Sequence, residues 1–372
     1  MSNPNTTKKI KVLIVCTVPS HINGITNVIF NILQHCDFSK FEFGYVSINL
    51  PHPRYQNLLK ELNIKHFTIP RKISNPLSYI SDLSKIAKEY DIIHVHGNSA
   101  TMVLEMLAAR IGQVRIRIAH SHNTTCNMRL LDWFFRPLFY KLCNTRMACS
   151  EDAGQWLFRH RNFTILKNGI NTESFVYDSQ KRRSIRDAFN ISNEVLIGHI
   201  GNFIPQKNHS LLIQIFHDYH KINPHSKLML IGEGELMGNI KELVRNLNIS
   251  TDVIFTGSVP NAADYLSAID LILMPSLYEG FPLTMIEAQA NGLRIVASST
   301  ISESSNITDL VSFVPINAHT DQWVNTMSSL ISNDNSREET SQTAISKIKN
   351  CGFDIKQVTD TLMQIYKTKT CH

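Results

Sequence analysis

The chain has 372 residues, which is enough for two domains that each bury a hydrophobic core. Hydrophobic residues make up 43% and charged residues 18%, a composition that excludes a disordered chain. The net charge of +6 is compatible with phosphorylated ligands or anionic lipid. No run of like charges and no zinc-finger or RNA-recognition pattern occurs, so nucleic acid is not predicted as a partner.

The N-terminal segment carries lysines and then a short apolar run. No small-residue cleavage site follows this run, so we interpret it as a first β-strand rather than a signal peptide. Seven scattered cysteines without C-x-x-C spacing favour a reducing compartment. No stretch is apolar for long enough to span a bilayer. We therefore expect a cytoplasmic protein, either free or at the inner face of the cell membrane.

Short apolar runs alternate with helical patterns along the chain, which predicts two doubly wound α/β domains. The runs expected in the first sheet are KVLIVCT, FEFGYVSI, DIIHVHG, RIRIAHSH, RMACS and FTILKNGI. Those expected in the second are VLIGHIGN, KLMLIGEG, DVIFTGSV, LILMPS, LRIVAS and VSFVPI. We expect domains at 1–176 and 177–354, and a C-terminal helix over 355–372 that crosses back to the first domain. If the carboxyl ends of the two sets of strands face each other, the active site lies between the domains.

Candidate substrate contacts follow the strands predicted in the first domain. Gly24 lies in the first loop, where a backbone without a Cβ can approach a substrate, although an ordinary turn glycine is the alternative. The histidine pairs in HVH (94–96) and HSH (120–122) suggest a metal, but neither shows a third ligand, so no metal site is predicted. His122 is at the carboxyl end of a strand and is a candidate substrate contact.

An aromatic and basic segment covers residues 128–147. It is expected either to lie on a membrane surface or to be a core-facing helix with snorkelling cations. Pro137 is expected to interrupt any long helix there.

Two patterns in the second domain suggest a phosphate site. Lys207 precedes a predicted helix, where a lysine and free N–H groups can bind phosphate, although a solvated loop lysine is the alternative. Gly232, Gly234 and Gly238 have a spacing one residue off the dinucleotide fingerprint, which is weak support for NAD. Two acidic residues one apart, the usual divalent clamp for a diphosphate, are not expected in the chain, so Lys207 and helix ends are expected to meet the diphosphate charge.

The stretch SLYEGFPLTMIEAQANGLRIVAS places one carboxylate just before a short helix and another in its second turn. We expect the helix to begin near Pro282 and to end at Gly292. Glu287 then leans toward the helix N-terminus and toward Glu279, where an anion flanked by hydroxyls can bind. The alternative is that Glu279 caps the helix and that Glu287 pairs with a nearby cation.

These motifs together resemble the retaining GT-B glycosyltransferases of family 4, over nearly the whole chain. The most specific is EGFPLTMIE, from Glu279 to Glu287, and GNFIPQKN with Lys207 resembles the phosphate loop of the family. KNGIN, from Lys167 to Asn171, resembles the N-G-I-D segment of the family before the linker. MACSEDAG and RIAHSHNT resemble the branch that builds bacterial capsular polysaccharides and exopolysaccharides.

The resemblance implies a role for each matched residue. Glu287 would bind the ribose, Glu279 the hydroxyls of the donor sugar, and His122 the transferred sugar. Val259 would meet the uracil through its backbone, and Gly24 would let its loop approach the diphosphate. The diphosphate would be held by Lys207 and by the backbone of Gly280, Phe281, Pro282, Leu283 and Thr284. Asn202 stands where the family usually has arginine, which leaves more of the phosphate charge to Lys207.

The implied reaction moves a sugar from a UDP-sugar to a saccharide or a polyprenyl-diphosphate-linked saccharide. The reaction needs no cofactor and no protein nucleophile. Glu279, His122 and Lys207 are therefore expected to act in catalysis by contacting the substrate and stabilising its charge, without forming a covalent bond to it. A sugar-nucleotide epimerase of the same fold is one alternative. A nucleotide-sensing protein without turnover is another, and an NAD enzyme is disfavoured by the glycine spacing.

Overall fold

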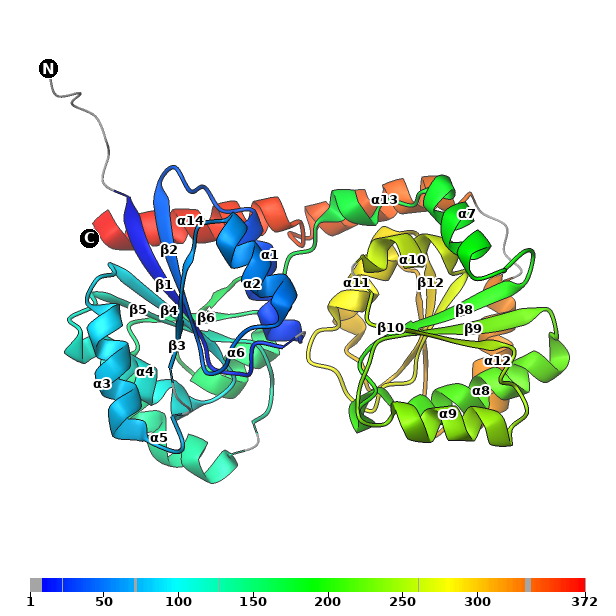
Figure 1. Ribbon diagram of the computed structural model, residues 1–372, viewed down its shortest axis with the longest axis horizontal. Helices are drawn as coiled ribbons and strands as arrows, with labels where there is room; N and C mark the ends of the chain where they lie inside the picture. Colours follow the sequence, from blue (N-terminus) through cyan, green and yellow to red (C-terminus); the bar gives the residue numbers. More distant parts are fainter. Residues whose placement is uncertain are drawn as a thin grey trace, which may run out of the picture. The chain divides into compact units, whose positions relative to one another are not determined.

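Continuous runs of valine, isoleucine and leucine form two fully parallel sheets, one in each of two units (Figure 1). The first unit comprises Met1–Gly169 and Gly352–His372, and the second comprises Ile170–Cys351. The computed structural model describes residues 9–21, 23–69, 72–126, 128–259, 261–331 and 336–371. Helices cover both faces of each sheet, which confirms the predicted doubly wound α/β architecture.

The sheet of the first unit has the strand order β3-β2-β1-β4-β5-β6-β7. Its strands are β1 (Ile10–Cys16), β2 (Phe41–Ser47), β3 (Lys65–Thr68), β4 (Ile92–Gly97), β5 (Ile116–Ser121), β6 (Thr145–Ala148) and β7 (Thr164–Ile165). Its helices are α1 (Gly24–Gln34), α2 (Pro53–Glu61), α3 (Pro76–Ala87), α4 (Val103–Ile111), α5 (Arg129–Leu142), α6 (Glu151–Phe158) and α14 (Ile355–Cys371). The half-exposed edge strand β3 was not predicted, because KHFT has no apolar run.

The sheet of the second unit has the order β10-β9-β8-β11-β12-β13. Its strands are β8 (Val195–Ile200), β9 (Ser226–Ile231), β10 (Val253–Gly257), β11 (Leu271–Met274), β12 (Arg294–Ser298) and β13 (Val311–Val314). Its helices are α7 (Ser179–Ala188), α8 (His209–Ile222), α9 (Met237–Asn246), α10 (Ala262–Ala268), α11 (Leu283–Ala290), α12 (Thr320–Ile331) and α13 (Arg337–Asn350). Short 3₁₀ turns include η3 (Pro205–Lys207), directly before α8.

Helix α5 differs from its prediction in one respect. It runs through Pro137 without ending, so the expected interruption is wrong. Its inner face is held by Arg136, which forms an ion pair with Asp132 at 2.6 Å and donates to the carbonyl of Leu157 at 2.8 Å. Asp132 in turn accepts from the backbone N–H of Ala100 at 2.7 Å. These contacts compensate for the backbone bond that proline cannot make.

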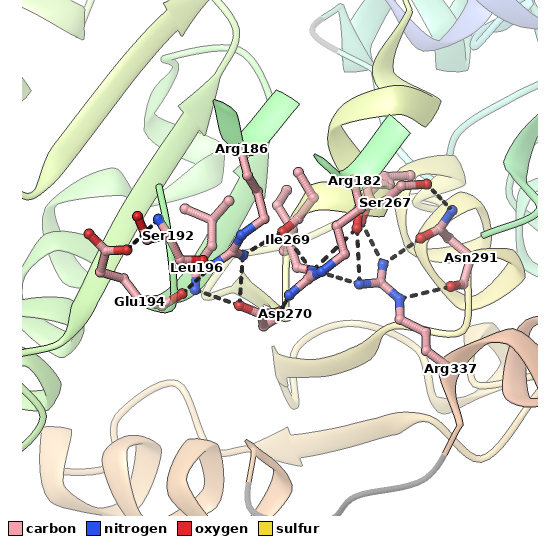
Figure 2. Close-up of polar contacts among 12 residues, drawn as sticks. Arg182, Arg186, Ser192, Glu194, Leu196, Ser267, Ile269, Asp270, Asn291 and Arg337 are labelled. Atoms are coloured by element: carbon pink, nitrogen blue, oxygen red, sulfur yellow. Dashed lines mark hydrogen bonds and ion pairs between the residues drawn. The ribbon is translucent and has the colours of Figure 1, made fainter. Parts of the chain in front are cut away.

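Three arginines converge on the C-terminal end of α10 (Figure 2). Arg182 and Arg186, from α7, both donate to the carbonyl of Ala268 and both pair with Asp270. Arg337, from α13, donates to the carbonyl of Leu266 at 2.6 Å and also to that of Ile269. The carbonyls at a helix end lack intrahelical partners, and cations there also complement the helix dipole.

The same guanidinium of Arg337 reaches the end of α11. It bonds both the backbone and the side-chain oxygen of Asn291, the residue that follows α11. Burial lowers the pKa of Arg337 to about 9, with a further lowering from the neighbouring Arg182. This arginine cluster therefore fixes α7, α10, α11 and α13 to one another at the amino edge of the second sheet, where β8, β11 and β12 begin.

Replacing Arg337 with alanine should loosen the second unit. The carbonyls of Leu266 and Ile269 would lose a charged donor, which costs about 3 kcal/mol. Hydrogen exchange measured by mass spectrometry should speed up in peptides from α10 and α11. The exposed Arg183 on α7 is the matched control, because Arg183→Ala should change stability by less than about 0.5 kcal/mol. Equal exchange in both variants would show that the cluster does not hold these helices.

Candidate functional site

Each sheet has a switch point, where the strand order reverses and the loops diverge to opposite sides. In the second unit this point lies between β8 and β11, which are adjacent in the sheet. The loop after β8 carries Lys207, and the loop after β11 carries Glu279. Parallel pairing puts both loops at the same edge of the sheet, where doubly wound domains bind their ligands.

Lys207 is held at this edge by its surroundings rather than by solvent. The Lys207 side chain is 14% exposed. Its aliphatic part lies against Gly201, where a Cβ would come within 3.2 Å of the Lys207 Cε. Asn208 follows in the left-handed region, at φ 53°, and turns the chain from η3 into α8. The alternative of a solvated loop lysine does not describe this partly buried cation.

Glu279 forms an ion pair with Lys207. The Lys207 Nζ lies 2.6 Å from the Glu279 Oε1, and the Glu279 side chain is 7% exposed. Gln206 donates to the other carboxylate oxygen at 3.1 Å and to the Tyr278 carbonyl at 3.0 Å. Gln206 was not predicted from the sequence, where its one signal is that it precedes Lys207. Glu279 does not cap α11, because Pro282 is the N-cap residue.

Helix α11 begins and ends close to the predicted positions. It starts at Leu283 after Pro282, whose side chain cannot accept a hydrogen bond from the first-turn N–H groups. It ends in a turn with Gly292 at φ 72°, where Leu293 N–H donates to the Ala288 carbonyl at 3.0 Å. This is a Schellman motif, which glycine forms without strain. Gly280, Phe281 and Thr284 lie at the same N-terminal end.

Glu287 is half-buried in the second turn of α11. Desolvation raises the pKa of Glu287 to about 7. Among the described residues none forms an ion pair with this carboxyl, so the alternative of a cation pair is not found. An acid with a raised pKa and no partner is a typical feature of a binding or catalytic site.

The glycines of the IGEGELMG segment serve packing within the unit. Gly232 and Gly234 have φ of 141° and 158°, and a Cβ on either would collide with the backbone of the loop at 201–203. Gly238 lies in α9 and has open space around it. The glycine spacing that gave weak support for NAD is therefore explained by the contact between two loops.

The expectation that no acidic residues lie one apart is wrong, because such pairs occur at Glu89–Asp91 and Glu233–Glu235. Asp91 accepts from the backbone N–H of Lys11 at 2.9 Å. Glu233 accepts from the backbone N–H of Ser258 at 3.3 Å. Each pair thus has one carboxylate engaged with the backbone.

The remaining predicted residues of the second unit lie near the same edge. Asn202 is exposed directly after β8 and brings no positive charge. Val259 follows β10, and its side chain packs against the hydrophobic core.

In the first unit Gly24 begins α1 rather than forming a turn. Asn23 caps the helix by accepting from the Thr26 N–H at 3.1 Å. A Cβ at Gly24 would meet no described atom within 4 Å. Packing inside the protein therefore does not explain the glycine, and the alternative of a turn glycine is wrong.

His122 lies at the carboxyl end of β5 and is 8% exposed. Its Nε2 is 2.9 Å from the Nδ1 of His96. Burial lowers the pKa of His122 to about 3, and an interaction with Asn168 opposes this. His122 is therefore neutral at physiological pH, and can offer a hydrogen bond to an uncharged group.

The two histidine pairs form one group. Parallel pairing of β4 and β5 sets His96 opposite His120, so that His94, His96 and His120 present ring nitrogens within 4.8 Å of one another. The expectation that neither pair has a third ligand is wrong, because it considered each pair on its own strand.

Two family models match the chain. Glycosyltransferase Family 4 matches residues 22–174, and Glycosyl transferases group 1 matches residues 181–347. The putative glycosyltransferase EpsF of Bacillus subtilis is 29% identical over 364 residues, which are 93% of this chain and 94% of that protein.

Two further proteins are similar. The UDP-Gal:alpha-D-GlcNAc-diphosphoundecaprenol alpha-1,3-galactosyltransferase of Escherichia coli is 24% identical over 64% of this chain and 67% of its own. The crystal structure of Anabaena Alr3699/HepE in complex with UDP and glucose has a TM-score of 0.79 at 16% identity, over 96% of this chain and 100% of that one. The chain therefore has the GT-B fold.

Glu287→Gln should remove a pH-dependent loss of stability. With a pKa of about 7 in the folded protein, Glu287 holds a proton that the unfolded chain has already released. Its contribution is therefore complete below the ordinary glutamate pKa and is lost as pH rises through about 7. The unfolding temperature of the variant minus that of wild type should increase between about pH 5 and pH 8. Glu242→Gln, at an exposed position on α9, should show no such trend, and a flat difference for Glu287→Gln would contradict the raised pKa.

Proposed function

Because this chain belongs to the glycosyltransferases with family 4 and group 1 domains, we propose that it transfers a sugar from a UDP-sugar with retention of configuration. The acceptor is a saccharide or a polyprenyl-diphosphate-linked saccharide in bacterial surface polysaccharide synthesis. The observation that carries this proposal is the Lys207–Glu279 pair at the β8/β11 switch point, beside the N-terminus of α11. The names of EpsF and of the E. coli galactosyltransferase support the reaction class.

Stabilisation of the leaving diphosphate is the main chemical task. Negative charge grows on the phosphate as the bond to the anomeric carbon breaks, and preorganised donors stabilise it most when water is largely excluded. Lys207 is such a donor, since it is partly desolvated and held by Gly201 and η3. The first-turn N–H groups of α11 add donors that Pro282 leaves uncapped.

The ion pair suggests how Glu279 takes part. Without a donor, the carboxylate of Glu279 neutralises the Lys207 cation at 2.6 Å. A diphosphate carries more charge and competes for the same ammonium group, which leaves Glu279 oxygens to accept from hydroxyls of the donor sugar. Gln206 keeps the carboxylate in place during this exchange.

Glu287, Val259, His122 and Gly24 complete the proposed contacts. Glu287 accepts from the ribose hydroxyls in its ionised form, and the backbone at Val259 meets the uracil. In the first unit His122 contacts the transferred sugar as a neutral imidazole, which avoids repulsion from the positive charge on the sugar in the transition state. For Gly24 the proposal follows the family resemblance, in which a glycine at this position lets its loop approach the diphosphate.

The test is a mass-spectrometric screen of UDP-sugars against saccharide and polyprenyl-diphosphate-linked acceptors, with EDTA present. Transfer to an acceptor supports the proposal. Conversion of the donor to an epimer without acceptor would identify the epimerase, and binding without any turnover would identify the sensing protein. Loss of turnover in EDTA with recovery on adding Mg²⁺ or Mn²⁺ would contradict a diphosphate site that works by Lys207 and N–H groups.

Lys207→Ala should slow transfer by about 30- to 1000-fold, because a charged contact to the leaving group is worth about 2–4 kcal/mol in the barrier. The measurement is the rate at saturating donor, with folding checked by circular dichroism. Lys221→Ala is the matched control, since Lys221 is an exposed lysine of the same unit. A folded Lys207→Ala protein with wild-type turnover would remove Lys207 from the site.

Glu279→Gln and Glu287→Gln should affect different steps. UDP has no sugar, so calorimetry with UDP reports the ribose contacts assigned to Glu287, and Glu287→Gln should weaken binding. Glu279→Gln also frees Lys207 for the diphosphate, so UDP binding should hold or tighten while kcat falls. If UDP binding weakened in Glu279→Gln and not in Glu287→Gln, Glu279 would be the ribose contact and Glu287 the contact to the donor sugar.

Helix α5 offers a surface for a membrane that holds lipid-linked acceptors. Its outer face carries Leu130, Trp133, Phe134 and Leu138, which are 85%, 74%, 66% and 44% exposed. Arg129 and Lys141 are exposed at its two ends, which suits an anionic bilayer. The opposite face of α5 packs on the core through Phe139 and Leu142, as the alternative of a core-facing helix expects. Within the described part of the chain, every helix is too short or too polar to cross a bilayer.

Trp133→Ser combined with Phe134→Ser should reduce binding to anionic vesicles by at least about 10-fold. Added salt should weaken wild-type binding, because the cations contribute to it. Ile222→Ser is the control, since Ile222 is 67% exposed on α8 in the other unit. Salt-insensitive and equal retention of both proteins by neutral and anionic vesicles would argue against docking through α5.

A further inference from the structure

Four histidines form a buried group on one face of the first sheet. His94 and His96 point to the same side of β4, and His120 and His122 to the same side at the end of β5. Their rings stack with centroids between 4.2 and 5.3 Å apart. Their exposed fractions are 0%, 2%, 1% and 8% in sequence order. Histidine is seldom buried in such a group, since each ring brings two polar nitrogens out of water.

The hydrogen bonds of the group leave two buried ring nitrogens, the His120 Nε2 and the His122 Nδ1, without a described partner. The His94 Nδ1 is 2.6 Å from the Tyr366 hydroxyl on α14, and the His94 Nε2 is 3.2 Å from the His120 Nδ1. If His94 donates to Tyr366, then His120 donates to His94 and keeps a free lone pair on its Nε2. If Tyr366 donates instead, His120 keeps an unused N–H there. In either case the buried His120 Nε2 has no described partner, so hydrogen bonds within the group leave a polar atom unsatisfied.

The spacing of the ring nitrogens suits a metal ion. His94, His96 and His120 each present one within 4.8 Å of the others. Zinc binds histidine nitrogen at about 2.0–2.1 Å in a tetrahedron, which requires nitrogens about 3.4 Å apart. The 3.2 Å between His94 and His120 already meets this requirement. A small movement of His96 completes three ligands.

The chemistry of the group also favours a metal. A neutral imidazole keeps a lone pair on one ring nitrogen, which is the atom that a metal ion binds. Tyr366 bonds the nitrogen of His94 that faces away from His120, as hydrogen-bonding partners of metal-bound histidines do. All-imidazole ligand sets suit Zn²⁺ and its neighbours rather than Mg²⁺ or Ca²⁺.

We propose that His94, His96 and His120 bind a Zn²⁺ ion, with a fourth position on the side of His122. The ion would fix the carboxyl ends of β4 and β5 and, through Tyr366, the C-terminal helix α14. It would also set the position of the His122 ring. This site is independent of the proposed diphosphate site in the second unit and does not rest on the proposed function.

The test uses the full chain without a polyhistidine tag. After chelation and dialysis, the protein should take up about one Zn²⁺ or Co²⁺ per chain, and Co²⁺ should give the visible absorption of a tetrahedral nitrogen site. His96→Asn and His120→Asn should each lower the affinity by at least about 100-fold, and Tyr366→Phe by about 10- to 100-fold. His66→Asn is the matched control, because His66 is a partly buried histidine of the same unit that bonds Ser47 outside the group.

Uptake below about 0.1 ion per chain, or equal uptake in wild type and His120→Asn, would overturn the proposal. Uptake below this level would show that the four histidines are a buried hydrogen-bonded group that binds no metal. If the histidine variants fail to fold, X-ray absorption on zinc-loaded wild type decides the question. Three or four imidazole ligands support the site, and two or fewer overturn it.

Discussion

Parallel pairing of the strands is the constraint on which the rest of the structure depends. It brings the carboxyl end of every strand in a sheet to one edge, so residues far apart in the sequence become neighbours there. Lys207 and Glu279 are 72 residues apart and form an ion pair because β8 and β11 are adjacent. His94 and His120 meet for the same reason across β4 and β5. Both groups follow directly from the order of strands in the sheets.

The cationic side chains of the second unit have two different roles, since some hold helix ends together and one lies at the candidate site. Arg182, Arg186 and Arg337 are used to hold helix ends and Asp270, and are not available for a ligand. Lys207 is the cation left at the carboxyl edge beside α11, and a carboxylate already balances it. A diphosphate would therefore bind by replacing one anion with a stronger one. The net positive charge of the chain gives no guide to this arrangement.

The two carboxylates of the candidate site differ because their surroundings differ. Glu279 lies beside a cation and an amide donor, which keep it as an acceptor of hydrogen bonds. Glu287 lies on α11 without an ion pair among the described residues, and desolvation raises its pKa to about 7, so near neutral pH it can release its proton to solvent and accept hydrogen bonds from a polar ligand. The arginine cluster supports this helix from its other end, through Asn291. Stability and the candidate site are thus linked through α11.

The sequence by itself determined the fold class and the local positions. Apolar runs separated by helical patterns predicted two doubly wound sheets, and Pro282 and Gly292 bounded α11, because hydrophobic periodicity and backbone restrictions act over a few residues. The resemblance to glycosyltransferases rested on the same local motifs. Predictions from the sequence failed where residues that are distant in the sequence but adjacent in space determine the local structure. The edge strand β3 has no apolar run, Pro137 is tolerated because Arg136 and Asp132 anchor α5, and Gly232 and Gly234 are required by the loop after β8. The third histidine of the buried group and the partner of Lys207 came only from tertiary structure, since strand order and register place them and no local pattern encodes either.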